Sequence, residues 1–329
     1  MEIKENIPLA PFSNYRIGGP ARYFTRIGNL KELREVLEFW KEKGAGRPIF
    51  ILGGGTNILF DDAGFNGLVV QINLEHLYLI GKDVVSAGAG TSMADLVEFC
   101  RRNSLAGMEW ASGLPGTVGG ATRGNAGAFG REMKDSVIQT TSVKIGEPGR
   151  VIERNRKTLR FGYRTSFFKK NSGEIILGVR IKLKKGSKKK IEEIGKKNRD
   201  YRREYQPLEF PNAGSTFKNV PLTQINADSN ADKRGYISVN QRENLRKSAL
   251  VIKTDPFPVV PAAYLISEAG LKGQRKGGAE ISVKHPNFII NRENASSSDV
   301  RELIRFAKDA VKEKFGVDLE EEIIFVPTK

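Results

Sequence analysis

Two glycine-rich segments hold the residues best suited to binding chemistry in this 329-residue chain. The first, Gly53-Gly54-Gly55-Thr56-Asn57, follows the apolar stretch 48–52. Three adjacent glycines allow positive φ and keep side chains away from the backbone, so successive N–H groups can point at one anion, with Thr56 and Asn57 as further donors. Such a loop suits a diphosphate, although a tight turn after a strand has the same composition. It matches neither the Walker loop nor the GxGxxG dinucleotide loop.

The second segment, 113–130, contains seven glycines among its eighteen residues. So many glycines let a chain lie flat against a large planar or extended ligand. A flexible surface loop is the alternative, but the segment carries Leu114, Val118 and Phe129 and little charge. The two segments together predict one nucleotide cofactor that is contacted by both of them. The candidate cofactor-binding residues are Gly53, Gly54, Gly55, Thr56, Asn57, Gly116, Thr117, Gly119, Gly120, Asn125 and Gly127.

The net charge of +16 indicates either a nucleic acid or small polyanionic ligands as partners. Binding of single-stranded nucleic acid predicts aromatic residues interleaved with Lys and Arg on a strand face. The most basic segment, 182–204, has only Tyr201. We therefore expect small anionic ligands and no nucleic acid.

Composition also bears on location and on metals. A single cysteine, Cys100, cannot form an internal disulfide and indicates a reducing compartment. No stretch approaches the roughly 20 apolar residues of a membrane helix, and residues 1–6 lack the apolar region of a signal peptide. No Cys/His cluster has metal-ligand spacing. We expect a cytoplasmic protein that does not insert into membranes and binds no metal.

The elements that must position these segments mix helices and strands over short distances. Asn29 is a helix cap, and Leu33, Val36, Leu37 and Trp40 fall on one face of the following helix. The segment 182–204, with eleven basic and four acidic residues, is expected to be a solvated helix between domains. The predicted helices cover 30–43, a stretch after Thr91 or Ser92, 182–204, 262–269 and a stretch after Ser298, and the predicted strands cover 48–52, 68–72, 83–87, 137–144, 175–182, 287–290 and 323–326.

An ordered set of motifs resembles the UDP-N-acetylenolpyruvoylglucosamine reductase family over nearly the whole chain. The matching stretches are 15–21, 52–57, 112–130, 161–166, 211–219, 263–273, 284–288 and 315–322. The resemblance implies an α+β protein with a vanillyl-alcohol-oxidase/PCMH-type FAD-binding fold of two subdomains and a C-terminal α+β substrate-binding domain. We expect domains at 1–80, 81–203 and 204–329, an FAD region at about 18–183, and a last strand that is able to return to the FAD domain.

The resemblance implies an NADPH-dependent flavoenzyme of peptidoglycan precursor synthesis. Such an enzyme reduces the enolpyruvyl group of UDP-N-acetylglucosamine enolpyruvate to give UDP-N-acetylmuramate. Hydride passes from N5 of reduced FAD to the β-carbon of the enol, and a proton must then reach the α-carbon. The main alternative is an FAD-linked oxidase of the same fold that acts on a hydroxy acid or sugar.

The resemblance also assigns roles to single residues. Arg164, in Tyr-Arg-Thr-Ser, would contact the substrate carboxylate and favour the enolate-like intermediate. Ser215, in Ala-Gly-Ser, would donate the proton, and Glu322, the second glutamate of the Leu-Glu-x-Glu pattern, would act beside Arg164. The residues expected to contact substrate are Lys218, Asn219 and His285.

Four further expectations concern cofactor attachment, loops and oligomeric state. Neither His76 nor His285 lies in a glycine-rich segment, so FAD is predicted to be non-covalent. The connection 167–174 is too short for a tyrosine-bearing insertion, so the chain resembles the branch without that loop. The excursion 220–261 is predicted to cover the UDP end of the site, and the protein is expected to be a monomer.

Overall fold

The computed structural model describes residues 2–222 and 258–328. Its first layer is an N-terminal mixed sheet covered by one helix. Strand β1 (Lys4–Pro8) pairs antiparallel with β2 (Pro20–Ile27), and β2, β5 (Phe65–Ile72) and β3 (Ile49–Leu52) run parallel in that order. Helix α1 (Leu30–Lys43) buries Leu33, Val36, Leu37 and Trp40, and Asn29 accepts the N–H of Glu32. The predicted helix and its cap are confirmed.

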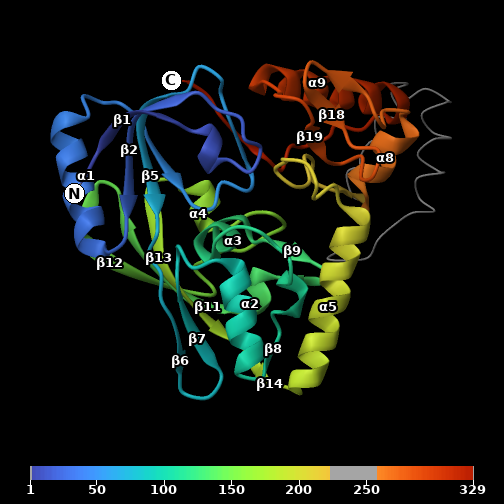
Figure 1. Cartoon of the computed structure of the whole chain (residues 1–329). Coiled ribbons are helices and arrows are strands. Elements are labelled where there is room, and N and C mark those ends of the chain that lie inside the picture. Colours follow the sequence, from blue (N-terminus) through green and yellow to red (C-terminus); the bar gives the residue numbers. More distant parts are fainter. Residues whose placement is uncertain (1, 223–257, 329) are drawn as a thin grey trace, which may run out of the picture.

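A five-stranded antiparallel sheet forms the second layer (Figure 1). Its order is β12 (Glu147–Asn155), β11 (Val137–Lys144), β13 (Glu174–Lys182), β7 (Val84–Gly88) and β6 (Leu77–Ile80). Helices α2 (Met93–Arg102) and α3 (Val118–Gly124) and the single turn α4 (Phe167–Lys170) share its core, which is continuous with the core under α1. The first glycine-rich segment therefore follows β3 of the N-terminal sheet, whereas the second follows a 3₁₀ turn at Glu109–Ala111 and contains α3. The two sheets share one hydrophobic core.

The charged segment forms helix α5 (Lys188–Tyr205), which is mostly exposed as expected but also has one buried face. Its buried face carries Arg202, whose Nε donates to the carbonyl of Ser112 at 3.1 Å, and Asn198, whose amide donates to the carbonyl of Glu109 at 2.9 Å. The helix is thus docked on the 3₁₀ turn η2 (Glu109–Ala111) by polar side chains. A hydrophobicity pattern cannot reveal such a face, because the residues that bind the carbonyl groups are themselves polar.

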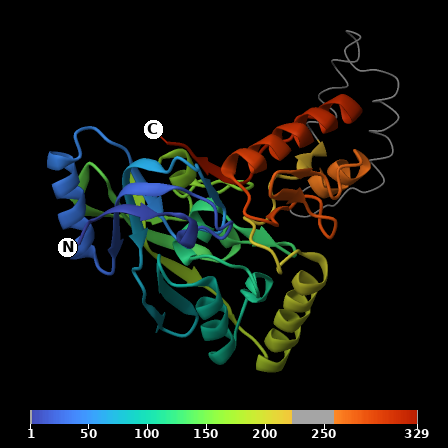
Figure 2. The same ribbon diagram turned by 45° about the horizontal axis from the view of Figure 1, so that its top comes forward.

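The C-terminal part is a small sheet covered by two helices. Strands β17 (Arg275–Lys276), β18 (Ala279–Ile281) and β19 (Ile289–Asn291) pack against α8 (Ala262–Glu268) and α9 (Ser297–Phe315). The last strand, β20 (Ile324–Val326), leaves this part and pairs parallel with β4 (Ile58–Phe60). Both views show this red strand running from the C-terminal helices to the blue N-terminal part (Figures 1 and 2).

The remaining described elements are short. They are η1 (Ala10–Phe12), β8 (Leu105–Ala106), β9 (Gly127–Ala128), β10 (Arg131–Glu132), η3 (Met133–Asp135), β14 (Lys184–Lys185), β15 (Val220–Pro221) and β16 (Val259–Val260). Most of the 220–261 excursion lies outside the described residues, so its predicted role over the UDP end of the site is not addressed by the structure. Within the described ranges, no helix is long and apolar enough to cross a bilayer.

Asp62 fastens the C-terminal part to the N-terminal one at the start of α9. Its carboxylate accepts the N–H of Ser297 at 2.8 Å and the Ser297 hydroxyl at 2.8 Å. The amide of Asn14 also donates to the carbonyl of Asn212 at 2.6 Å, and that of Asn291 donates to the carbonyl of Tyr15 at 2.9 Å. Polar contacts between segments far apart in sequence therefore hold the two parts together.

We predict that Asp62→Ala lowers the free energy of unfolding by about 1–2 kcal/mol, because α9 loses an N-terminal capping carboxylate. Urea unfolding monitored by circular dichroism measures the change. Asp309→Ala is the matched control, since this exposed aspartate lies in the body of the same helix. An equal loss in both variants would show that overall charge, and not the cap, is responsible.

Candidate active site

The two glycine-rich segments meet face to face. A Cβ placed on Gly54 would lie 2.9 Å from the Cα of Gly116, and one placed on Gly116 would lie 2.8 Å from Oγ1 of Thr56. We call residues 53–57 the first glycine loop and residues 113–130 the second. Part of their glycine content is explained by this close approach, which no larger residue permits.

The first loop also needs a left-handed residue. Gly55 has φ +65°, and a Cβ there would lie 1.9 Å from the carbonyl oxygen of Phe12. The carbonyl of Gly55 accepts the N–H of Asn14 at 2.9 Å, so the N-terminal segment fixes the bend. Within the described residues, the N–H groups of Gly54, Gly55 and Thr56 donate to no main-chain carbonyl. The loop thus keeps donors available for an anion, which fits the diphosphate of FAD.

Other glycines of the second loop face open space. A Cβ on Gly124 would meet no atom within 4 Å, and one on Gly120 would meet only Oγ1 of Thr117, at 3.4 Å. Thr117 caps α3 by accepting the N–H of Gly120. Protein packing does not require glycine at 120 or 124, so this side of α3 has room for a flat ligand.

The side chains or packing of several predicted cofactor residues also serve protein contacts, and those of Asn125 and Gly127 are the most extensive. Asn125 is fully buried, and its amide donates to Glu132 at 3.1 Å and to the carbonyl of Gly162 at 2.8 Å. Gly127 belongs to the β9–β10 hairpin, where a Cβ would lie 2.6 Å from the Cγ of Glu132. A contact from Asn125 to the cofactor would have to come from its main chain.

Arg164 and Glu322 form an ion pair of 2.6 Å between Nε and Oε1. Arg164, at φ +53°, lies in a tight turn closed by hydrogen bonds between Gly162 and Thr165. Its Nη2 donates to the carbonyl of Gly127 at 3.0 Å, which places the guanidinium beside the second glycine loop. A turn of the second layer therefore meets the segment that leads into the last strand.

The three adjacent glutamates each have a different cationic partner. Glu322 pairs with Arg164, Glu321 pairs with Lys308 at 3.0 Å, and Glu320 pairs with Lys218. This register follows from pairing with the segment after Ser215, because Lys218 donates its N–H to Glu320 and Glu322 donates its own to Thr216. Of the three, only Glu322 meets the arginine of the Tyr-Arg-Thr-Ser motif.

Ser215 lies at the start of that paired segment. It is half-buried, and within the described residues its hydroxyl makes no hydrogen bond. The next residue is held on both sides, since Thr216 donates its N–H to the carbonyl of Asn287 at 2.7 Å and accepts that of Glu322 at 2.8 Å. The main chain at Ser215 is therefore fixed while its hydroxyl stays available.

The predicted substrate-binding residues surround the same segment. The N–H of Asn219 donates to the hydroxyl of Tyr163 at 3.2 Å, and its side-chain oxygen accepts the N–H of Ala262 at the start of α8. His285 stands two residues before Asn287, and its ring packs against Phe288 with the centroids 4.7 Å apart. Arg164 and Glu322 are thus in direct contact, whereas Lys218 and Asn219 are linked to them through their sequence neighbours Glu320 and Tyr163. Ser215 and His285 are brought near the pair by the main-chain bonds of Thr216 with Asn287 and Glu322.

Comparison with known proteins identifies the family of this arrangement. A family model described as UDP-N-acetylenolpyruvoylglucosamine reductase, C-terminal domain, matches residues 206–326, and one described as FAD binding domain matches residues 21–153. UDP-N-acetylenolpyruvoylglucosamine reductase of Clostridium novyi is 35% identical over 99% of this chain and 92% of its own length. The chain belongs to the UDP-N-acetylenolpyruvoylglucosamine reductase family.

A second relative and a solved structure support the same family assignment. The enzyme of the same name from Caldanaerobacter subterraneus is 35% identical over 98% of this chain and 93% of its own length. The crystal structure of UDP-N-acetylenolpyruvylglucosamine reductase from Thermus caldophilus has a TM-score of 0.74 at 29% identity, covering 99% of this chain and 100% of that one. The resemblance read from the motifs is confirmed, as are the α+β fold and the FAD-binding domain.

Sequence reasoning missed two members of the site, Tyr163 and Lys169. The Nζ of Lys169 donates to the carbonyl of Arg164 at 2.9 Å, because the single turn of α4 directs Lys169 back toward the turn. Burial, together with the nearby charge of Lys218, lowers the pKa of Lys169. No sequence pattern distinguishes this lysine from its neighbour Lys170.

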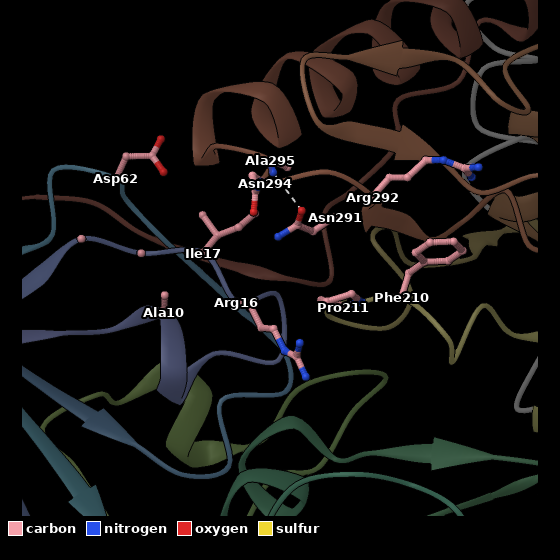
Figure 3. Close-up of a pocket in the computed structure, with 12 residues that line it drawn as sticks. Ala10, Arg16, Ile17, Asp62, Phe210, Pro211, Asn291, Arg292, Asn294 and Ala295 are labelled. Carbon is pink, nitrogen blue, oxygen red and sulfur yellow. Dashed lines mark hydrogen bonds between the residues drawn. The ribbon is translucent and has the colours of Figure 1, made fainter.

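A cavity of about 550 Å³ lies between the N-terminal segment and the C-terminal part (Figure 3). Arg16 of the N-terminal segment and Arg292 of the C-terminal part are among its lining residues. None of the predicted catalytic residues lines it. The candidate active site is therefore located by the predicted catalytic residues and the glycine loops, and not by this cavity.

The glycine positions separate into two kinds, and substitution tests the distinction. We predict that Gly55→Ala lowers the free energy of unfolding by about 1–3 kcal/mol, because a left-handed alanine is strained and its Cβ meets the carbonyl of Phe12. Gly124→Ala should raise it by up to about 1 kcal/mol, because alanine favours the helix and meets nothing. Urea unfolding of the cofactor-free protein measures both, and a loss of stability in Gly124→Ala would contradict the open position.

Glu322 allows a prediction about pH. Burial raises the pKa of its carboxyl, although Arg164 and Lys169 oppose the rise. A raised pKa in the folded state means that the folded protein takes up the proton before the unfolded chain does. Wild-type stability relative to Glu322→Gln should therefore increase as pH falls from the raised value toward the ordinary carboxyl pKa.

Urea midpoints of both proteins at several pH values between 8 and about 5 measure this difference. The contributions of the other carboxyl groups to the pH dependence of stability cancel, because both proteins contain them. A wild type that loses stability relative to the variant on acidification would show that Arg164 dominates and lowers the pKa of Glu322.

Proposed function

We propose that the protein catalyses the NADPH-dependent reduction of UDP-N-acetylglucosamine enolpyruvate to UDP-N-acetylmuramate, a step of peptidoglycan precursor synthesis. Family membership supports this reaction. The observation that carries it is the ion pair between Arg164 and Glu322, which lies beside the second glycine loop and next to the segment of Ser215.

The two glycine loops are the proposed FAD site. The N–H groups of Gly54, Gly55 and Thr56 would hold the diphosphate, and the open side of α3 would receive the flat part of the cofactor. When bound, FAD supplies the redox chemistry, accepting hydride from NADPH and passing it to the β-carbon of the enol. His76 lies outside the loops, with its Nε2 3.2 Å from the hydroxyl of Ser86, which supports non-covalent binding.

Arg164 is proposed to bind the carboxylate of the enolpyruvyl group. Hydride addition at the β-carbon places negative charge on the α-carbon and this carboxylate, so a fixed guanidinium binds the intermediate more tightly than the substrate. The guanidinium is fixed by Glu322 on one side and the carbonyl of Gly127 on another. Glu322 would orient Arg164 and hydrogen-bond at the reacting end of the substrate.

Ser215 is the proposed proton donor to the α-carbon. A serine hydroxyl is a weak acid, so it needs a short approach and a neighbouring cation. Its available hydroxyl and the nearby Lys218, three residues on, support this role. The cationic side chains of Lys169 and Lys218 would also attract the diphosphate of a UDP-sugar, with Asn219 and His285 as further contacts.

The domain division at 80 and 203, the monomeric state and the cytoplasmic location stay predictions. So does the absence of a tyrosine-bearing loop over the substrate.

The function is tested with purified protein loaded with FAD. NADPH oxidation should be slow alone and fast after addition of the enolpyruvyl sugar nucleotide. A protein that ignores NADPH and consumes oxygen with a hydroxy acid or sugar would instead be an oxidase of the same fold.

We predict that Ser215→Ala separates the two half-reactions. Flavin reduction by NADPH should keep its rate, whereas reoxidation by the enolpyruvyl sugar nucleotide should slow at least about 100-fold, because the proton donor is lost. Stopped-flow absorbance of the flavin measures both steps. Ser298→Ala, at an exposed serine of α9, is the control, and an equal loss in both half-reactions of Ser215→Ala would contradict the assignment.

A further inference from the structure

A buried carboxylate lies behind Arg164, on the side of the second glycine loop. Glu132 is only 3% exposed, at the end of the β9–β10 hairpin. Its Oε2 accepts the amide of Asn125 at 3.1 Å and lies 2.5 Å from the Nζ of Lys134. Its Oε1 is buried and has no hydrogen-bond partner among the described residues. The Glu132 side chain also forms a capping box with Asp135 at the start of η3. One of its oxygens nevertheless stays unsatisfied, which costs stability and calls for an explanation.

Asn125 connects this carboxylate to the turn that carries Arg164. Its amide nitrogen donates both to Glu132 and to the carbonyl of Gly162, and its carbonyl oxygen accepts the N–H of Lys134 at 2.9 Å. Gly162 closes the turn by exchanging hydrogen bonds with Thr165. Asn125 itself is left-handed, with φ +46°, and ends helix α3. Its side chain thus links the base of the Arg164 turn, at Gly162, to Glu132 and Lys134.

The hairpin provides a second connection. Glu132 pairs with Gly127, and its Cγ occupies the space where a Gly127 side chain would be. The carbonyl of Gly127 in turn accepts the Nη2 of Arg164 at 3.0 Å. Burial disfavours the charged guanidinium, but Glu322, Tyr163 and Glu132 outweigh it, so the pKa of Arg164 lies above its ordinary value. Glu132 therefore acts on Arg164 through its charge as well as through the backbone.

We propose that Asn125 and Glu132 are positioning residues that hold Arg164 in its left-handed turn, facing Glu322, through Gly162 and Gly127. This inference rests on the proposed function of Arg164 as the residue that binds the substrate carboxylate. It replaces the cofactor contact predicted for the Asn125 side chain. In this role the side chains of both residues act through Arg164 and need no contact with substrate or cofactor.

The experiment uses the FAD-loaded protein with Asn125→Gly and Glu132→Gln. Glycine accepts the left-handed conformation without strain, so Asn125→Gly removes the amide and keeps the backbone. Each variant should slow flavin reoxidation by the enolpyruvyl sugar nucleotide about 10- to 100-fold, because a small displacement of a positioning group is costly. Flavin reduction by NADPH and the dissociation constant of FAD should stay within about threefold of wild type, as the cofactor site is intact.

A double-mutant cycle with Arg164→Lys separates positioning from general destabilisation. With Arg164 already replaced, adding Glu132→Gln or Asn125→Gly should cause little further loss. Glu174→Gln is the matched control, because Glu174 is a buried carboxylate paired with Arg154 at 2.6 Å inside the five-stranded sheet. It should lower stability and leave the reoxidation rate unchanged.

Three results would overturn the inference. The first is a wild-type rate of flavin reoxidation in Asn125→Gly. The second is a double variant whose loss of reoxidation rate equals the product of the two single losses. The third is a higher dissociation constant of FAD in Asn125→Gly together with equal losses in both half-reactions. The last would restore Asn125 as a cofactor contact. If wild-type reduced flavin is not reoxidised by the sugar nucleotide, the proposed function fails first, and the inference fails with it.

Discussion

The ion pair between Arg164 and Glu322 is the contact on which the arrangement of the site depends. The arginine belongs to a turn of the five-stranded layer, and the glutamate belongs to the segment before the last strand. A partly buried pair of this kind is stable only when both charges are well placed, because either charge alone would be left partly desolvated. The geometry of the pair therefore requires the FAD-binding part and the C-terminal part to keep one relative position. The contacts of Asp62, Asn14 and Asn291 between the same two parts serve that requirement.

The glycine loops obey a different constraint, which is steric. Gly54 and Gly116 approach so closely that a side chain on either would collide with the other loop, whereas Gly120 and Gly124 leave open space. The same residue type thus does two things in one segment. It permits the packing that fixes the loops, and it leaves a surface without side chains for a flat ligand.

Local patterns predicted the parts of the fold that depend on local physics. The cap at Asn29 and the apolar face of Leu33, Val36, Leu37 and Trp40 are sufficient to define α1, and the register of the three glutamates could be chosen from the family motif. The buried face of helix α5 was missed because Arg202 and Asn198 donate hydrogen bonds to buried carbonyl groups, which a hydrophobic pattern cannot express. Lys169 was missed, and the protein contacts of the Asn125 side chain were not foreseen, because each donates to a main-chain carbonyl of the Arg164 turn.

The return of the last strand explains how the chain combines these constraints. Strand β20 pairs with β4, which begins directly after the first glycine loop, and the amide of Asn57 donates to the carbonyl of Glu322 at 3.1 Å. Glu322 is therefore positioned relative to the loop proposed to hold the diphosphate, while Arg164 is positioned relative to the second loop through Gly127. A shift of either loop would be transmitted to one partner of the ion pair and not to the other. Because the loops are themselves locked together at Gly54 and Gly116, the reacting residues and the cofactor site share one rigid frame.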